Sequence, residues 1–183
     1  MGKTTLDKLK FPIGKHQKLS EYSNDYLSGC INQIEVFPSE IIKVVSQLSD
    51  LQLDTRYREN GWSIRQVVHH CADSHMNSLI RFKLALTEEK PSIRPYYEDR
   101  WAELVDSKTI PIEPSLKILE GIHARWVLLL RSLSNEDLCR TFIHPESGEE
   151  VALDENISIY AWHCRHHLAH ITELIKRKGW KKI

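Results

Sequence analysis

Trp162-His163-Cys164-Arg165-His166-His167-Leu168-Ala169-His170 carries four of the ten histidines of this 183-residue chain. Around this segment, apolar residues recur at spacings of four and three, at Ile157, Ala161, Cys164, Leu168, Ile171 and Ile175. Such spacing predicts a helix with one face in a hydrophobic core. Tyr160, His163, His167 and His170 follow the same spacing one residue earlier, so they form a stripe at the edge of that core.

The histidines His163 and His167 lie four residues apart, so both imidazoles project from one face of the predicted helix. Two such histidines on a rigid helix are typical of half a metal site. A hydrogen-bonded histidine cluster is the alternative interpretation, since His166 and His170 share the spacing. In zinc proteases a glutamate precedes the second histidine, whereas here His166 does, so we set that enzyme class aside.

The composition is that of an ordinary soluble globular protein, with 25 basic residues, 25 acidic residues and 41% hydrophobic residues. The length favours one domain over residues 1–183. Zero net charge argues against nucleic-acid and anionic-membrane partners. The longest apolar run, near Trp126–Leu130, is too short to span a bilayer, and no signal peptide or myristoylation motif is present. We therefore expect a cytoplasmic protein.

The chain predicts four long helices, over residues 23–47, 63–87, 115–133 and 154–179. Pro38 should kink or split the first helix. Ser63 and Gln66 form a capping box at the start of the second, and Gly179 ends the last. Residues 140–143 and 149–153 flank turn residues and predict a hairpin. The expected fold class is therefore all-α, a four-helix bundle with a small β-hairpin before the last helix.

The connections between these helices are expected to be irregular. Residues 1–20 show no periodicity, and residues 51–60 read as extended. The connection over residues 88–114 contains four prolines and the aromatic residues Tyr96, Tyr97 and Trp101, with a short helix expected over 99–105. Connections of this length commonly act as binding loops or lids.

The second helix is the expected source of a further metal ligand, because bundle cores build metal sites from facing helices. It offers His69, which we place on the outward face, and His70, which lies on a polar strip with Ser74, Asn77 and Arg81. It also offers His75, which points towards the core and is open to interpretation as a hydrogen-bonded core residue. The cysteines Cys71 and Cys164 fall on apolar seams and are expected to be buried thiols.

Several segments carry a family resemblance. They are Gly61-Trp62-Ser63-Ile64-Arg65-Gln66-Val67-Val68-His69-His70-Cys71-Ala72-Asp73-Ser74-His75-Met76-Asn77-Ser78, residues 53–58, residues 81–89, residues 163–173 and the closing Gly179-Trp180. Together they resemble the YfiT branch of the DinB superfamily of bacterial proteins. The resemblance runs from about Phe11 to Trp180, nearly the whole chain.

The resemblance implies a four-helix bundle that binds one divalent metal ion per subunit, zinc or nickel, through three histidines. Matched residue by residue, these are His70, eight residues after Trp62, and the pair His163 and His167. His170 takes the place of a glutamine found in many members. The resemblance therefore implies that His170 supports the metal ligands without binding the metal itself. The resemblance also implies a cytoplasmic homodimer.

The activities that the resemblance implies are metal-dependent hydrolysis and, for some members, thiol transfer with bacillithiol or mycothiol. Three histidines leave an open coordination position, which is typical of catalytic zinc. Water activation and thiol activation use the same ligands, so both reactions on a small-molecule substrate remain open. A bundle that binds metal or a small ligand without turnover is the third alternative. No strong general base stands out, which slightly favours this third alternative. Asp73 and Glu173 could lie behind the ligands, but surface charge is the favoured role for each.

Overall fold

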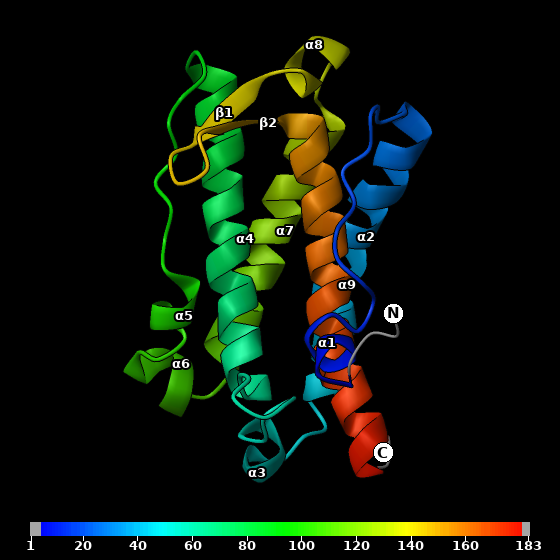
Figure 1. Cartoon of the computed structure of the whole chain (residues 1–183), viewed down its shortest axis with the longest axis vertical. Helices are drawn as coiled ribbons and strands as arrows, with labels where there is room; N and C mark the ends of the chain where they lie inside the picture. The colour runs from blue at the N-terminus through cyan, green and yellow to red at the C-terminus, as the bar shows by residue number, and fades with distance from the viewer. Residues whose placement is uncertain (1–4, 181–183) are drawn as a thin grey trace.

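Four long helices form the body of the computed structural model, which describes residues 5–180 (Figure 1). They are α2 (Asn24–Val45), α4 (Ile64–Thr87), α7 (Glu113–Arg131) and α9 (Leu153–Lys178). Helix α2 packs on α9 and α7, and α4 packs on the same two helices. The predicted four-helix bundle is confirmed, and so is the hairpin before the last helix.

The ends of these helices follow the local signals in the sequence. At the start of α4, the Ser63 side chain accepts from the Gln66 backbone N–H and the Gln66 side chain accepts from the Ser63 N–H. Helix α9 ends at Gly179, which has a φ of 63°. A left-handed residue there favours glycine, because other residues have an unfavourable Cβ contact in that conformation.

Helix α2 runs unbroken through Pro38, so of the two expected outcomes, a kink or a split, the split does not occur. Proline has no backbone N–H, which removes the usual donor for the carbonyl of Ile34, four residues earlier. His123 of α7 supplies a donor instead, with its Nδ1 atom 2.6 Å from the Ile34 carbonyl oxygen. A neighbouring helix therefore satisfies the group that the proline frees.

The connections contain more helix than their sequences predict. Short helices occur at α1 (Thr5–Lys10), α3 (Asp50–Leu53), α5 (Glu98–Trp101), α6 (Val105–Thr109) and α8 (Asn135–Leu138). Thus the first segment and residues 51–60 are partly helical, and two short helices replace the single one expected over 99–105. Serine caps explain two of them, since Ser49 begins α3 and Ser134 begins α8, each with a complete capping box.

Strands β1 (Thr141–His144) and β2 (Glu149–Ala152) pair antiparallel, with Thr141 opposite Ala152 and His144 opposite Glu149. The hairpin lies across one end of the bundle (Figure 1). An isolated bridge between Ser92 and Ile143 attaches the long connection after α4 to β1. This attachment brings the long connection and the hairpin turn to the same side of α4.

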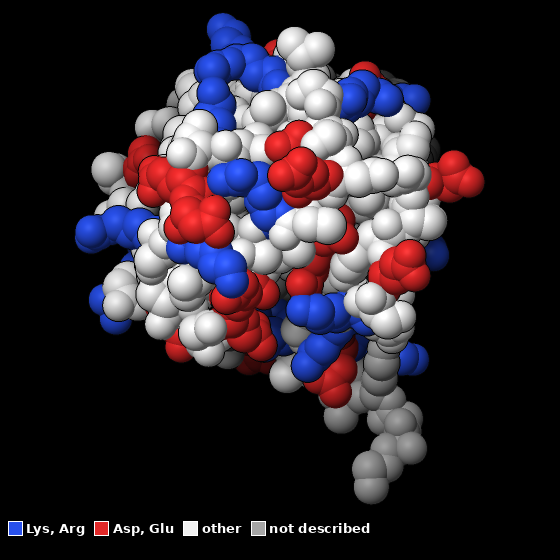
Figure 2. Space-filling view, turned by 90° about the horizontal axis from the view of Figure 1, so that it is seen from above, with Lys and Arg blue, Asp and Glu red and all other residues white. Residues whose placement is uncertain are grey.

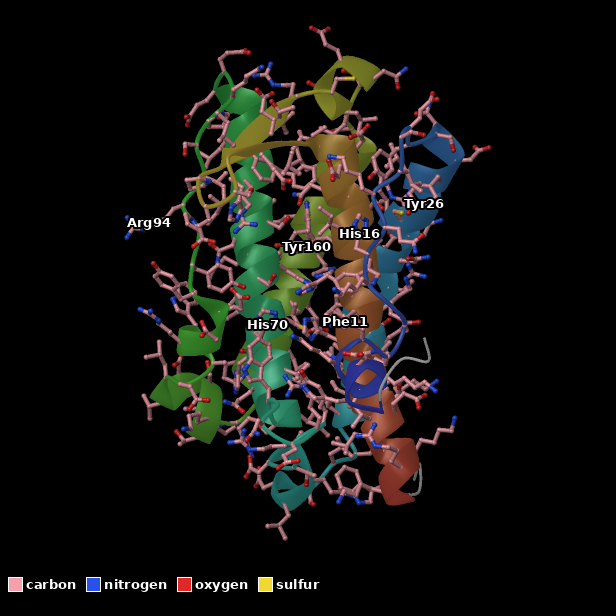
Figure 3. All side chains as sticks on the ribbon, in the orientation of Figure 1. Phe11, His16, Tyr26, His70, Arg94 and Tyr160 are labelled. Carbon is pink, nitrogen blue, oxygen red and sulfur yellow. The ribbon has the colours of Figure 1, made fainter. Side chains whose placement is uncertain are left out.

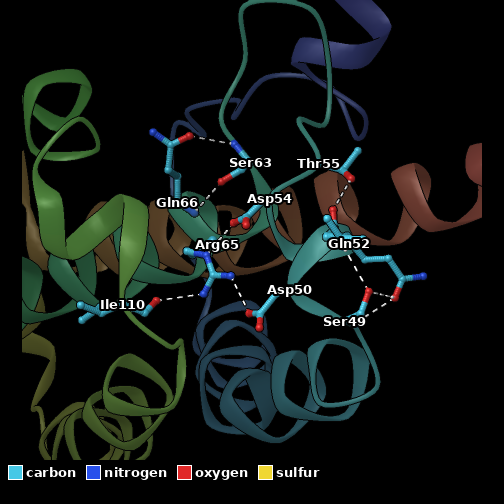
Figure 4. A network of polar contacts seen from close by, with 10 residues as sticks. Ser49, Asp50, Gln52, Asp54, Thr55, Ser63, Arg65, Gln66 and Ile110 are labelled. Atoms are coloured by element: carbon cyan, nitrogen blue, oxygen red, sulfur yellow. Dashed lines mark hydrogen bonds and ion pairs between the residues drawn. The ribbon is translucent and has the colours of Figure 1, made fainter.

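A buried arginine joins the short helix α3 to the start of α4 (Figure 4). The Arg65 side chain is 5% exposed and forms ion pairs with Asp54 at 2.6 Å and Asp50 at 2.7 Å. Its third bond goes to the carbonyl of Ile110, 2.9 Å away. One side chain therefore fixes three segments around the first turn of α4.

Acidic and basic side chains are interspersed on the face shown in Figure 2, with no large area of one sign. Among the described residues, no helix is long and apolar enough to cross a membrane.

Candidate metal site

Three histidines from two helices meet near the middle of the bundle. His70 comes from α4, and His163 and His167 come from successive turns of α9. One ring nitrogen from each lies within 4.8 Å of the other two. The Nε2 atoms of His70 and His163 are 3.3 Å apart. The structure thus brings together the three histidines named by the family resemblance.

The donor set suits a divalent metal ion, because all three imidazoles are held in the neutral form that binds metals. Burial, with a smaller contribution from His170, lowers the pKa of His70 to about 3. Burial also lowers the pKa values of His163 and His167 well below 6.5, and nearby histidines add to the effect. Within residues 5–180, the buried Nδ1 of His167 has no hydrogen-bond partner.

Aromatic rings form one wall of the site. The Trp62 ring lies 4.6 Å from the His70 ring and 6.4 Å from the His167 ring, between centroids. Gly61 permits this arrangement, because a Cβ atom there would lie 2.5 Å from Cγ of Arg58 and 3.3 Å from the Tyr57 ring. The turn before α4 therefore places an indole against two of the three histidines.

The three histidines open onto a cavity of about 710 Å³. Its polar lining includes Arg81 and Ser74 from the strip predicted on α4, and the long connection contributes Tyr96, Glu98 and Asp99. Figure 3 places the labelled His70 and Tyr160 side chains in the middle of the bundle. A larger cavity of about 900 Å³ lies beside α1 and Trp162, but none of the three histidines lines it.

The polar strip on α4 is only partly directed into the cavity. Ser74 Oγ lies 3.2 Å from the Tyr160 hydroxyl and 3.5 Å from His163 Nε2. The Asn77 amide instead donates to the carbonyl of Asp73 on its own helix. Asp73 is half-buried and does not line the cavity, and burial raises its pKa to about 6.

Two expectations about the remaining histidines need correction or refinement. His69 is buried rather than outward-facing, because the start of α7 packs there and Ser115 Oγ lies 2.7 Å from His69 Nδ1. His170 lines the same cavity and lies 5.4 Å from the His167 ring, between centroids, but it is not one of the three clustered histidines. Its Nε2 is 3.1 Å from the Lys10 carbonyl oxygen, and its ring stacks 4.0 Å from Tyr57.

The core interpretation of His75 is confirmed, since this residue is fully buried between His123 and His163. His123 was missed at the sequence level, although a signal exists. Leu119, His123, Trp126 and Leu130 follow spacings of four, three and four, which puts a histidine on the apolar seam of α7. Cys71 and Cys164 are buried, as predicted.

The long connection contributes to the cavity as expected, but not with all its aromatic residues. Tyr96 lines the cavity, and burial raises the pKa of its hydroxyl, whereas Tyr97 is 57% exposed. The hairpin adds His144, at the end of β1, and Glu146, in the turn. The sequence held no signal for these two, because only tertiary packing brings the hairpin over the cavity.

The sequence pattern of the DinB superfamily matches residues 33–171, which include all three histidines. The chain belongs to the DinB superfamily. Two relatives named "putative metal-dependent hydrolase" are similar over almost their whole length. The protein from Oceanobacillus iheyensis is 54% identical, over 93% of this chain and 98% of that protein. The protein from Bacillus cereus is 53% identical, over 96% of this chain and its own full length.

The solved structure of a similar protein agrees with this assignment. YfiT from Bacillus subtilis, described as a probable metal-dependent hydrolase with an unusual four-helix bundle topology, has a TM-score of 0.93. The two proteins are 48% identical, over 95% of this chain and 99% of YfiT. A mycothiol-dependent maleylpyruvate isomerase shares the fold at a TM-score of 0.63, with 16% identity over 82% of this chain and 66% of that one.

Proposed function

We propose that this DinB protein is a metal-dependent hydrolase that holds one divalent ion, zinc or nickel, through His70, His163 and His167. The observation that carries the proposal is the convergence of three neutral imidazoles, within 4.8 Å of one another, at the wall of an open cavity. Structural metal sites use four protein ligands, whereas three ligands beside a cavity are typical of a catalytic site.

A divalent ion bound in such a site acts as a Lewis acid and lowers the pKa of water, which supplies a nucleophile at neutral pH. The protein's own contribution is to position the reactants and exclude bulk water. Trp62 covers His70 and His167, so the site is shielded on that side. Tyr160 and Ser74, bonded to each other 3.2 Å apart, present hydroxyls beside His163.

Arg81 is the residue best suited to bind an acidic group of the substrate. It lines the cavity, and its buried Nε has no hydrogen-bond partner among residues 5–180. Arginine binds carboxylates through two parallel hydrogen bonds. The carboxylates Glu98, Asp99 and Glu146 line the same cavity and are candidates for moving a proton during hydrolysis. We therefore propose a small substrate with a carboxylate and a hydrolysable ester or amide bond.

Thiol transfer is the second candidate function, and two features favour it. A bundle of the same fold is a mycothiol-dependent isomerase, and an open zinc position accepts a thiolate as well as oxygen. In that reaction Arg81 would bind a carboxylate of the thiol or of its electrophilic partner.

The two reactions are separated by assaying the apoprotein, the metal-loaded protein and the His163→Ala variant. Each is tested with a panel of esters and amides, and with an electrophile in the presence and absence of a low-molecular-weight thiol. We expect the metal-loaded wild-type protein to hydrolyse an ester or amide without added thiol, and the apoprotein and His163→Ala to show no such activity. Turnover only with added thiol would replace hydrolysis by transfer. Equal turnover by apoprotein and metal-loaded protein would contradict both, and the absence of turnover would leave a binding protein.

A further inference from the structure

A continuous line of hydrogen bonds leads from His163 through the core of the bundle. The Nδ1 atom of His163 lies 3.0 Å from Nε2 of His75, and Nδ1 of His75 lies 2.7 Å from Nε2 of His123. The Nδ1 atom of His123 lies 2.6 Å from the carbonyl oxygen of Ile34. Each of the four long helices contributes one group, in the order α9, α4, α7 and α2.

The carbonyl at the end fixes the direction of every bond in this line. A carbonyl only accepts, so Nδ1 of His123 carries the proton. A neutral imidazole has one N–H, so Nε2 of His123 must accept, and the donor is Nδ1 of His75. By the same reasoning Nε2 of His75 accepts from Nδ1 of His163. The Nε2 atom of His163 is then left as an acceptor, and it faces His70 Nε2 at 3.3 Å and Ser74 Oγ at 3.5 Å.

The neutral state of these rings follows from their surroundings. His75 is 0% exposed and His123 is 2% exposed, and both pack against the Phe37 ring. Burial lowers the pKa of His123 to about 4, and the pKa of His75 also lies well below 6.5. An imidazolium in so apolar a place would need a paired anion.

The Ile34 carbonyl is available because of a single residue in α2. Pro38 occupies the position whose N–H would normally bond this oxygen within the helix. The proline thus has a consequence far from its own helix: it frees the acceptor that orders three imidazoles in turn.

We propose that His75 and His123 are positioning residues that hold His163 in its Nδ1–H tautomer and so aim its Nε2 lone pair at the metal. The metal itself rests on the proposed function, but the tautomer is a property of the apoprotein. Groups that bond the far nitrogen of a metal-binding histidine usually change metal affinity by roughly 10–100-fold when removed. The buried Nδ1 of His167, by contrast, has no hydrogen-bond partner within residues 5–180.

The test begins with ¹⁵N imidazole NMR of the apoprotein, which distinguishes the two tautomers of each histidine. We expect His75, His123 and His163 all to be Nδ1–H. The Nε2–H form at His163 in the wild-type apoprotein would overturn the proposal, whether or not the protein binds metal or has activity.

The second part measures the dissociation constant for Zn²⁺ alone, by competition with a chelator. His123→Phe removes both hydrogen bonds while filling the space, and we expect weaker Zn²⁺ binding by roughly 10-fold or more. His123→Gln, which retains one donor and one acceptor, should recover part of the affinity. The matched control is His69→Phe, which removes another buried histidine outside the line and should leave Zn²⁺ affinity unchanged.

Equal Zn²⁺ affinity in folded His123→Phe and wild type would contradict the proposal. An equal loss in His123→Phe and His69→Phe would also contradict it, since that result indicates general loosening of the bundle. A His123→Phe variant that does not fold leaves the wild-type tautomers and the His123→Gln variant to decide. If the wild-type protein binds no Zn²⁺, the proposed function fails, and the tautomers still decide the positioning role.

Discussion

Arg81, on the polar strip of α4, is the residue that we expect to select substrates with a negative charge. It lies on the same helix as His70, three turns further along, and it lines the same cavity. Arg94, in the connection over residues 88–114, is exposed and points away from the bundle (Figure 3). These two arginines therefore form a natural pair for testing whether a positive charge in the cavity selects anionic substrates.

For Arg81→Met we expect unchanged metal content and roughly a tenfold higher KM for carboxylate-bearing substrates, because the bidentate partner is lost. Matched neutral substrates should be little affected. Arg94→Met is the control and should behave as wild type. If Arg81→Met instead lowers the thermal stability strongly while KM stays constant, Arg81 is a structural residue and not a substrate-binding one.

At the scale of elements, the junction between α3 and α4 depends on one buried charge. Arg65 pairs with two carboxylates that remain 55% and 85% exposed, so these acids lose little solvation in forming the pairs. The arginine also supplies the bond to the Ile110 carbonyl just before α7. Trp62 lies three residues before Arg65 and His70 lies five residues after it.

We expect Arg65→Met to lower the free energy of unfolding by about 2 kcal/mol, because the Ile110 carbonyl loses its donor and two ion pairs are removed. Urea denaturation measures the change. Arg131→Met removes a surface ion pair with Glu35, in which both side chains are about half exposed, and should cost less than about 1 kcal/mol. Equal losses in the two variants would show that the buried junction has no special role.

The long helices could be predicted because their signals are local. The Ser63 capping box and the Gly179 end depend only on neighbouring residues, and the seam around Cys164 repeats over many turns. The burial of His69 could not be predicted, since it depends on Ser115 of a distant helix. For the same reason the hairpin gave no sign that His144 would reach the cavity.

The candidate site was predictable only in part from the residues themselves. The spacing of His163 and His167 indicated half a site, whereas the choice of His70 over its neighbours came from the family resemblance. The hydrogen bonds through His75 and His123 could not be predicted from the sequence, because they depend on how four helices pack together. Pro38 frees the carbonyl at the end of this line, but from the sequence of its own helix it predicted only a kink or a break.

For the whole molecule, the dominant electrostatic feature is the number of buried neutral histidines. Burial lowers the pKa of nine of the ten, to about 3 for His70 and His166 and to about 4 for His123 and His170. The unfolded chain, with ordinary values near 6.5, therefore binds more protons than the folded protein in mildly acidic solution.

Because the unfolded state takes up protons, the apoprotein should lose stability as pH falls below about 6.5, and should change little from this source above it. Each proton taken up contributes a slope of about 1.4 kcal/mol per pH unit. We expect the denaturation free energies between pH 7.5 and pH 5 to give an uptake of more than one proton. If the free energy of unfolding stays constant or increases as the pH falls from 7.5 to 5, the histidines are not buried as neutral groups.

We propose that His70, His163 and His167 hold the metal, and the zinc content of single-alanine variants after loading and desalting tests this directly. His70→Ala and His69→Ala change adjacent buried histidines on one helix, and His167→Ala and His166→Ala do the same on the other. We predict that His70→Ala, His163→Ala and His167→Ala lose most of the metal. His69→Ala and His166→Ala should retain about one ion per chain, as in the wild type. Full zinc occupancy in folded His70→Ala, or loss of zinc from His69→Ala, would contradict the account.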